Sequence, residues 1–295
     1  MNFNQLLIFH KVAELRHFTR AAEALYISQP AVSKQVHQLE KTLNQPLFTQ
    51  VGQKIYLTEA GKLLYDYADR IFALSAEAES ALGEMQQLER GRLTLGASTT
   101  IGTYLLPELL GRYKEQYPGI DLVVEIGNTE EIQQKLLVHR LEVGLVEGSV
   151  THQELSEQVW RQDELVLIAP PTYLLPEGEQ TIQQFLAQKP PVILREQGSG
   201  TRSVLEQALE RYGVEPVHPI IELGSTEAIK RAVAAGLGVS FVSAHTIQFE
   251  VASGYLKQIL LSNFSVRRSL LIVRLNEKCL SKAAQAFLHL IETTS

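Results

Sequence analysis

The sequence predicts an α/β protein made of three successive regions. Residues 1–58 carry three short helical patterns followed by a hairpin, and residues 59–90 continue as one long amphipathic helix. Residues 91–295 alternate strand and helix patterns to the end of the chain. This alternation decides the class, because strands separated by helices of this length form βαβ units. We therefore expect a small winged helical head, a linker helix and a large α/β domain.

Composition is that of a globular chain with a sizeable core. Of the 295 residues, 45% are hydrophobic and 20% are charged, and no apolar run approaches the roughly 20 residues that a membrane span requires. The N-terminus shows no secretory signal, and the one cysteine, Cys279, excludes an intramolecular disulfide. We expect a cytoplasmic protein with no membrane association, in which Cys279 is a small core residue of a C-terminal helix.

Charge is distributed unevenly along the chain. The net charge is −6, but residues 1–58 hold six basic and three acidic side chains, which gives this region +3 and the remainder −9. A basic head on an acidic body is compatible with nucleic-acid binding, because attraction depends on where the charge lies.

The head has the pattern of a helix-turn-helix. A first helix is indicated by apolar residues three apart, and Thr19 is expected to cap the second helix. Ser28 is expected to cap a third helix, with Pro30 in its first turn. The apolar stripe of the third helix leaves a polar face outward, which is typical of a recognition helix. Residues 48–57 predict a hairpin, the wing. The stripe of the third helix is formed by Val32, Val36, Leu39 and Leu43.

The predicted linker helix carries apolar residues at heptad spacing. An exposed helix of this length needs a partner for its stripe, so we expect it to pair with the same helix of a second copy. The alternative is that the stripe packs on its own domain. The stripe consists of Leu64, Ala68, Ile71, Ser75, Ala78, Leu82 and Met85.

The α/β region is expected to form a mainly parallel sheet, with ligands bound at the carboxyl ends of its strands. The predicted strands are Arg92–Ala97, Leu122–Ile126, Val143–Val146, Glu164–Ala169, Val192–Leu194, Ile220–Leu223, Val239–Val242 and Ser269–Arg274. The predicted helices are Leu105–Tyr117, Glu130–Leu137, Arg202–Tyr212, Thr226–Ala235 and Lys278–Glu292.

Three motifs in the head resemble the signature of LysR-type transcriptional regulators. They are the run from Phe18 to Ser33, the residues Gln38-Leu39-Glu40 through Leu47-Phe48, and Leu57-Thr58-Glu59-Ala60-Gly61. The resemblance continues at Gly91-Arg92-Leu93-Thr94-Leu95-Gly96 and so covers nearly the full chain.

This resemblance implies a winged helix-turn-helix in residues 1–58, a linker and dimerisation helix in 59–90 and an effector-binding domain in 91–295. The last would have two lobes of periplasmic-binding-protein type, lobe I from 91–162 with 266–295 and lobe II from 163–265. A homotetramer is implied too, and RNA polymerase is a candidate partner. Several stretches, among them Gly198-Ser199-Gly200-Thr201-Arg202, are similar to regulators of sulfur assimilation, sulfite response and carbon fixation.

The wing departs from the family pattern. Many members carry a basic residue where this chain has Gln50 and Gln53, and only Lys54 remains. We therefore expect few phosphate contacts from the wing and a shallow dependence of DNA affinity on salt.

On double-stranded DNA, the third helix is expected to enter the major groove of a promoter or operator. Glutamine can pair with adenine through two hydrogen bonds, serine with several base edges, and Ala31 with a thymine methyl. Thr19, Arg20, Lys34 and Lys54 are better suited to phosphates. The alternative is that this polar surface is an ordinary solvated helix face. The residues expected to contact DNA are Thr19, Arg20, Ser28, Gln29, Pro30, Ala31, Ser33, Lys34, Gln38 and Lys54.

Strand-to-helix turns in the α/β region are rich in hydroxyl groups. Hydroxyls and free backbone N–H groups at a helix start bind anions, although serine and threonine are also ordinary N-caps. Because two of these turns come from different lobes, we expect them to converge on one cleft that holds a small anionic effector. Arg195 or Arg202 would supply charge, and Glu147 would orient the site or hold a ligand proton. The expected effector site comprises Ser98, Thr99, Thr100, Asn128, Thr129, Glu147, Arg195, Ser199, Gly200, Thr201 and Arg202. An oxyanion such as sulfite is implied by the resemblance.

Other functional classes find little support. Gln197-Gly198-Ser199-Gly200-Thr201 lacks the outer glycines of a hydrolase elbow, no phosphate-binding loop motif is present, and the eight histidines show no metal-site spacing. We expect no catalytic residues, metal or cofactor. The alternative to a regulator is a cytoplasmic protein of solute-binding type, without specific DNA binding.

Overall fold

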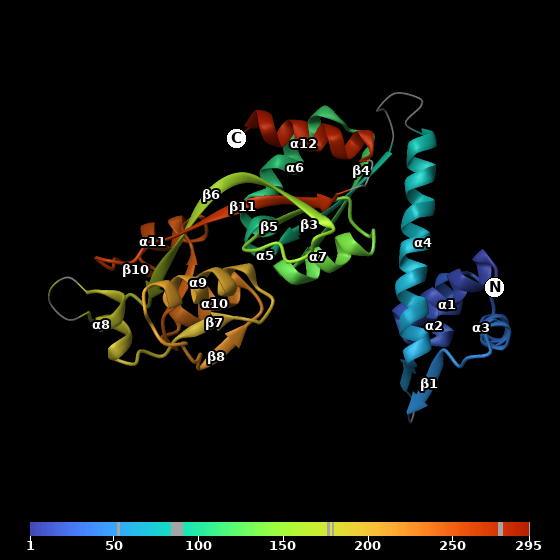
Figure 1. Ribbon diagram of the computed structural model, residues 1–295, viewed down its shortest axis with the longest axis horizontal. Helices are drawn as coiled ribbons and strands as arrows, with labels where there is room; N and C mark the ends of the chain where they lie inside the picture. The colour runs from blue at the N-terminus through green and yellow to red at the C-terminus, as the bar shows by residue number, and fades with distance from the viewer. Residues whose placement is uncertain (52–53, 84–90, 176–177, 179, 277–279, 295) are drawn as a thin grey trace. The chain divides into compact units, whose positions relative to one another are not determined.

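The computed structural model describes residues 1–51, 54–83, 91–175, 178, 180–276 and 280–294. The chain forms two compact units, which are Met1–Glu79 with Val138–Arg140, and Ser80–Leu137 with Leu141–Ser295 (Figure 1). The predictions for Gln53, Met85 and Cys279 fall outside the described residues. Among the helices that are described, none is long and apolar enough to span a membrane.

The head begins with the three expected helices. They are α1 (Phe3–Leu15), α2 (Phe18–Ala24) and α3 (Gln29–Leu43). Ser28 caps α3 as predicted, since its side chain accepts a hydrogen bond from the Ala31 backbone. The prediction that Thr19 caps α2 is wrong. His17 takes that role by accepting from Arg20 N, because the helix already begins at Phe18.

The wing is the antiparallel pair β1 (Phe48–Val51) and β2 (Lys54–Leu57), as predicted. Glu40 holds it to α3, since its carboxylate accepts hydrogen bonds from the backbone N–H groups of Leu47 and Phe48 at 2.8 and 3.3 Å. At the same end of the hairpin, a Cβ on Gly61 would lie 2.1 Å from the Leu47 carbonyl oxygen, so only glycine fits there. The Glu40 and Gly61 of the sequence motifs therefore position the wing.

The linker helix α4 (Glu59–Gly83) packs one face on the head. Leu64 and the fully buried Ala68 contact a core that includes Phe9 and Leu39. The first turns of the predicted stripe are thus used within the chain, in agreement with the alternative of packing on its own domain. The exposed large apolar side chains of the described part of α4 are Ile71, from the predicted stripe, and Leu63, Tyr67 and Leu74, which lie outside it.

The second unit contains a curled sheet in the order β10-β6-β11-β5-β3-β4, with β9 paired to β6, and a separate parallel pair, β7-β8. Its strands are β3 (Gly91–Ser98), β4 (Ile120–Gly127), β5 (Val143–Glu147), β6 (Leu155–Ala169), β7 (Ile193–Arg195), β8 (Ile221–Leu223), β9 (Ser240–Ser243), β10 (Lys257–Ile259) and β11 (Val266–Leu275). Its helices are α5 (Thr99–Tyr104), α6 (Leu106–Gln116), α7 (Thr129–Leu137), α8 (Ile182–Ala187), α9 (Gly200–Arg211), α10 (Thr226–Ala234), α11 (Gln248–Ala252) and α12 (Lys282–Thr294).

The expectation of a mainly parallel sheet is wrong. β3 pairs in parallel with β4 and β5, but β11 is antiparallel to both β5 and β6, and β6 is antiparallel to β9 and β10. Strand β6 also begins at Leu155 rather than Glu164, and α5, α8, α11 and β10 were not predicted. The reason is that β6 and β11 run as a long pair through the unit, so they cannot belong to simple βαβ repeats.

Each lobe has a core of its own. Leu93, Tyr113 and Phe287 pack together in lobe I, and Phe185 and Leu205 belong to the core of lobe II. Figure 1 shows β6 and β11 running side by side between these two masses. Their register shifts between Leu270 and Leu271, which marks a β-bulge partway along the pair.

Candidate functional site

The outward face of α3 matches the expected DNA interface in exposure. Ser28, Gln29, Lys34 and Gln38 are exposed, and Ser33 is half-buried. Gln29 Nε2 donates to Ser33 Oγ at 3.0 Å. These two candidate base-reading side chains therefore hold each other on the outward face of α3.

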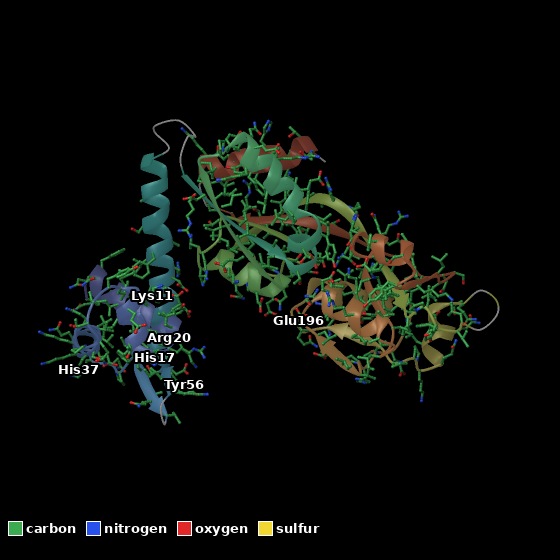
Figure 2. All side chains as sticks on the ribbon, turned by 180° about the vertical axis from the view of Figure 1, so that it is seen from behind. Lys11, His17, Arg20, His37, Tyr56 and Glu196 are labelled. Carbon is green, nitrogen blue, oxygen red and sulfur yellow. The ribbon has the colours of Figure 1, made fainter. Side chains whose placement is uncertain are left out.

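Three cations surround this face. Arg20 on α2 (labelled in Figure 2), Lys34 on α3 and Lys54 on the wing are all exposed. None of the three forms an ion pair with the residues that the structure describes. Unpaired exposed cations are available for phosphates without first breaking an internal bond. The remaining predicted contacts are also accessible, with Thr19 and Pro30 exposed and Ala31 half-buried.

The junction of the two lobes, where the sequence predicts the cleft, is built around the buried carboxylate of Glu147, at the end of β5. Ser98 from β3 donates to one of its oxygens. Thr201 from α9 donates to the other at 3.2 Å, and Arg268 Nη1 lies 3.7 Å from that oxygen. Because Ser98 belongs to lobe I and Thr201 to lobe II, this carboxylate connects the two lobes.

A buried ion pair continues the network. Arg268 Nε donates to Asp163 Oδ2 at 2.7 Å, and Arg268 Nη1 donates to Thr201 Oγ1 at 2.8 Å. Ser243 donates to the other oxygen of Asp163, Oδ1, at 2.8 Å. Arg268 lies on β11 and Asp163 on β6, so the pair lies on the two strands that run between the lobes. Charges this deeply buried need partners of this kind to remain ionised.

Two of the hydroxyl turns do not behave as ordinary caps. Ser98 and Ser199 occupy the N-cap positions of α5 and α9, yet neither side chain accepts a capping hydrogen bond. Ser225 does cap α10, and Asn128 accepts from Glu131 N at the start of α7. Capping therefore explains Ser225 and Asn128 and leaves Ser98 and Ser199 with another role.

Arg195 faces lobe I across the cleft. Its Nη2 donates to Thr99 Oγ1 at 2.7 Å, and its Nε pairs with Glu196 at 2.8 Å. Burial raises the pKa of the Glu196 carboxyl, but the hydrogen bond and charge of Arg195 outweigh burial and leave that pKa lowered. Arg195 Nη1 and Ser199 Oγ are both buried and have no hydrogen-bond partner among the described residues. A cation with an unused donor and a free hydroxyl are what an anion would need.

The start of α9 lies against lobe I. Thr129 Oγ1 donates to the Glu147 carbonyl at 2.8 Å, and the Glu130 backbone donates to the Gly198 carbonyl at 3.2 Å. A Cβ on Gly200 would lie 1.8 Å from the Glu147 carbonyl oxygen, so this approach requires glycine. Thr100 is also buried here.

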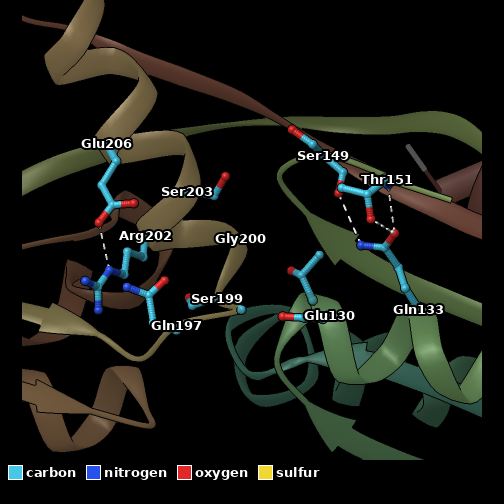
Figure 3. A pocket seen from close by; sticks show the side chains of 12 residues that line it. Glu130, Gln133, Ser149, Thr151, Gln197, Ser199, Gly200, Arg202, Ser203 and Glu206 are labelled. Atoms are coloured by element: carbon cyan, nitrogen blue, oxygen red, sulfur yellow. Dashed lines mark hydrogen bonds and ion pairs between the residues drawn. The ribbon is translucent and has the colours of Figure 1, made fainter.

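A polar cavity of about 330 Å³ opens between the starts of α7 and α9 (Figure 3). Gln133, Ser149 and Thr151 line one side, and Ser199 and Ser203 are among the residues of the other. Arg202 also borders it but pairs with Glu206 and Glu222, each at 2.8 Å. Of the two arginines named from the sequence, Arg195 therefore keeps the free donor.

A second connection between the lobes lies at Tyr104 of α5. Its hydroxyl donates to Glu227 of α10, and the Lys230 ammonium lies 4.9 Å from the centre of its ring. Burial, followed by the bond to Glu227, raises the pKa of Tyr104 to about 12. Burial lowers the pKa of Lys230, but Glu227 and Glu250 outweigh it and raise that pKa overall.

Sequence reasoning missed Arg268, Asp163 and Tyr104. A signal for Arg268 was present, because Val266, Arg268 and Leu270 alternate with polar neighbours and place the arginine on the inward face of a strand. Nothing comparable pointed to Asp163 or Tyr104, whose partners are distant in the sequence.

Two protein-family models cover almost the whole chain. The model for a bacterial regulatory helix-turn-helix protein of the lysR family matches residues 3–62, and the LysR substrate binding domain matches residues 86–295. The chain belongs to the LysR family of transcriptional regulators.

Individual relatives agree with this assignment. The chain is 37% identical to the "Probable RuBisCO transcriptional regulator" of Cyanidium caldarium, over 97% of this chain and 92% of that protein. It is 33% identical to the regulatory domain of CcmR from Synechocystis PCC6803, solved in complex with 2-PG, over 70% of this chain and 98% of that one, with a TM-score of 0.63. Full-length CbnR, solved with its target DNA, has the same fold with a TM-score of 0.75 at 21% identity, and each chain is fully covered.

This LysR-type chain is thus a regulator that binds DNA through its head, and not an enzyme. The family assignment also favours this function over the alternative of a solute-binding protein. The expected architecture, a winged helix-turn-helix followed by a linker helix and a two-lobed α/β domain, is confirmed.

Proposed function

We propose that a small anion in the cleft of the second unit controls DNA binding by the head. The single observation that carries this proposal is the buried Arg195 guanidinium with an unused Nη1 donor, near a turn whose Ser199 hydroxyl is also unused. Buried polar groups are almost always paired, so two unpartnered groups on elements at the junction of the lobes support a missing partner there. An oxyanion accepts hydrogen bonds from both.

The ligand would act by stabilising one arrangement of the lobes. Ser98 and Thr99 belong to lobe I, and Arg195, Ser199 and Thr201 belong to lobe II. A ligand that contacts both sets binds one arrangement more tightly than the others and shifts the population toward it. Its effect on DNA affinity is then a coupling free energy between two sites, and DNA must change the affinity for the ligand by the same factor.

The carboxylate of Glu147 restricts which anions fit. It already takes the hydroxyls of Ser98 and Thr201, so a fully ionised ligand beside it meets a like charge. A protonated oxyanion such as hydrogen sulfite can donate its proton to Glu147 while accepting from Arg195. The carbon-fixation names of the relatives and the 2-PG complex of CcmR make 2-PG the second compound to test.

Calorimetric titration of the full-length protein with sulfite, sulfate and 2-PG tests the site. We expect one of these to bind saturably, and Ser199→Ala to weaken that binding by about tenfold, since a hydrogen bond to a charged group contributes about 1.5 kcal/mol. Ser225→Ala is the matched control, because Ser225 is a serine of lobe II whose hydroxyl caps α10. Equal affinities for the two variants would contradict the placement of the anion.

A DNA-shift titration tests the coupling. The probe is the intergenic region upstream of the gene for this protein, at fixed salt, with and without the compound that binds. A shift that competitor DNA cannot displace and that changes with the compound supports control by an effector. Binding of the compound with no change in the shift would contradict it.

We further propose that α4 pairs with α4 of a second copy. The support is the row of exposed apolar side chains at Leu63, Tyr67, Ile71 and Leu74, of which Leu63 and Leu74 are 61% and 62% exposed. These residues recur every three or four positions and so form one stripe. Light scattering should show that Leu63→Glu with Leu74→Glu lowers the oligomeric state, whereas Glu59→Gln on the same helix leaves it unchanged. An unchanged mass in the double variant would contradict this pairing.

A further inference from the structure

Helix α2 ends in a conformation that suits glycine but is occupied by tyrosine. Ile27 N donates to the Ala22 carbonyl at 3.0 Å and Tyr26 N to the Glu23 carbonyl at 3.2 Å, which together form a Schellman motif. Tyr26 is the left-handed residue of this motif, with φ of 55°. A side chain with a Cβ is disfavoured in that region, and an aromatic one gains nothing there from a local hydrogen bond to the backbone.

The end of α3 provides a comparison within the same head. There the left-handed residue is Asn44, with φ of 51°, and the Gln45 backbone closes the turn by donating to the Glu40 carbonyl at 3.1 Å. Asparagine is the residue that, after glycine, tolerates this conformation best. Helix α3 therefore ends in a conformationally suited residue, whereas α2 ends in Tyr26 and α1 in Arg16, with φ of 48°, neither of which is suited.

Packing does not account for the tyrosine. Tyr26 is 96% exposed, more than any other large apolar or aromatic side chain that the structure describes. Its hydroxyl forms no hydrogen bond and its ring contacts no other ring within those residues. The side chain therefore contributes to neither the core of the head nor its surface contacts.

The position of Tyr26 in the helix-turn-helix places its side chain where DNA would bind. It lies in the turn between α2 and α3, two residues before Ser28, which caps the helix whose polar face is exposed. In a helix-turn-helix, the second helix enters the major groove by its N-terminal end while the first crosses the backbone. The turn between them must then face the sugar-phosphate strand at the edge of that groove. A tyrosine hydroxyl there can donate to a phosphate oxygen.

We propose that Tyr26 is a DNA-positioning residue that donates a hydrogen bond from its hydroxyl to a backbone phosphate. The contact adds no positive charge and reads no base. It therefore strengthens binding to operator and to unrelated duplex alike, and it orients the start of α3 over the groove.

Two variants separate this role from a structural one. Tyr26→Phe removes only the hydroxyl and should weaken binding by about tenfold, because a phosphate oxygen is a charged acceptor. Tyr26→Asn places the residue type of Asn44 in the turn, so it should raise the melting temperature of the head by about 2–4 °C while weakening DNA binding at least as much. If Tyr26 served only to stabilise the fold, its replacement would not raise the melting temperature while weakening DNA binding.

The measurement is fluorescence anisotropy with the full-length protein, a genomic fragment that the wild type retains, and a duplex of random sequence, over a range of salt concentrations. Tyr26→Phe should lower affinity by the same factor on both duplexes and at every salt concentration, since no counterion-releasing charge is removed. Tyr255→Phe, a half-exposed tyrosine of the second unit, is the control. Wild-type affinity in Tyr26→Phe, or a loss confined to the genomic fragment, would overturn the proposal.

Discussion

The recognition face of the head and the cleft of the second unit are both rich in polar side chains, but their environments are opposite. Arg20, Lys34 and Lys54 stand exposed and form no ion pair among the described residues. In the cleft, Glu147, Asp163 and Arg268 are at most 5% exposed, and each contacts a group of opposite charge or a hydroxyl.

The two regions therefore lose the hydration of their charged side chains at different stages. The cleft loses the hydration of its charges during folding, so those charges are already held by partners in the protein and a ligand must fit between them. The head keeps its cations hydrated until DNA releases their counterions and those of the phosphates. Substitutions in the cleft should therefore change stability, and substitutions on the recognition face should change affinity.

The largest effect is expected at the buried ion pair. Arg268→Met leaves Asp163 as an uncompensated buried charge and should lower the free energy of unfolding by about 3–5 kcal/mol. Urea unfolding of the full-length protein, followed by circular dichroism, measures this. Arg267→Met, at an exposed position of the same strand, is the control and should change stability by less than about 0.5 kcal/mol. A similar loss of stability in Arg268→Met and Arg267→Met would contradict the conclusion that the buried charges of the cleft stabilise the fold.

A slightly smaller effect is expected where α9 meets β5. Gly200→Ala places a Cβ 1.8 Å from the Glu147 carbonyl oxygen, so backbone must move, and we expect the free energy of unfolding to fall by about 2–3 kcal/mol. Gly111→Ala is the opposite case, because nothing lies within 4 Å of its Cβ position inside α6. That variant should be more stable by about 0.5–1 kcal/mol. Thermal unfolding of both variants should show a loss of stability for Gly200→Ala and a gain for Gly111→Ala. Unchanged stability in Gly200→Ala would contradict the expected clash and show that the backbone around Glu147 moves at little cost.

The recognition face should respond through affinity alone. Lys34→Ala should leave stability within about 0.5 kcal/mol and should flatten the slope of log affinity against log salt by about 0.9 for each phosphate that the lysine would otherwise neutralise. Lys41→Ala lies on the last turn of the same helix and is the control. An anisotropy titration in which both variants keep the wild-type slope would contradict the assignment of Lys34 to phosphate.

Among the stabilising contacts between the lobes, the smallest effect is expected at Tyr104. Tyr104→Phe removes the hydrogen bond to Glu227 and should cost about 1 kcal/mol. A pKa raised to about 12 means that the neutral hydroxyl is favoured in the folded state. Its stabilisation is therefore complete below the ordinary value of 10.0 and is lost as pH rises through about 12. Urea midpoints of wild type and variant should converge over that interval, and a constant difference would contradict the pKa assignment.

The sequence allowed the head to be predicted almost completely. Its helices and hairpin are set by local signals, such as the cap at Ser28 and the stripe from Val32 to Leu43, and these do not depend on distant residues. Thr19 was misassigned because His17, a less common capping residue, begins the helix earlier.

The second unit was predicted in outline only. Strand positions follow from apolar runs, but an apolar run does not show whether its strand is parallel or antiparallel to its neighbours. The antiparallel pairing of β6 and β11 could therefore not be inferred. Residues Leu155–Asp163 alternate weakly because that part of β6 has one open face. In the cleft, Ser98 and Thr201 were predictable as hydroxyls at helix starts. Glu147 was also named from the sequence, but its binding to both hydroxyls, and Arg268 beside it, depend on contacts across the fold.

The β-bulge in the β6–β11 pair has a mechanical consequence. Leu270 pairs with Arg161 and Leu271 with Val159, so Trp160 is the unpaired residue at the point where the ribbon bends. Because both strands continue through the bulge, any movement of one lobe relative to the other has to bend this ribbon. Trp160 is the only tryptophan of the protein, it is 8% exposed, and no described residue accepts a hydrogen bond from its indole N–H. We therefore expect the emission of Trp160 to change when the ribbon bends, which would allow that bending to be followed without an added label.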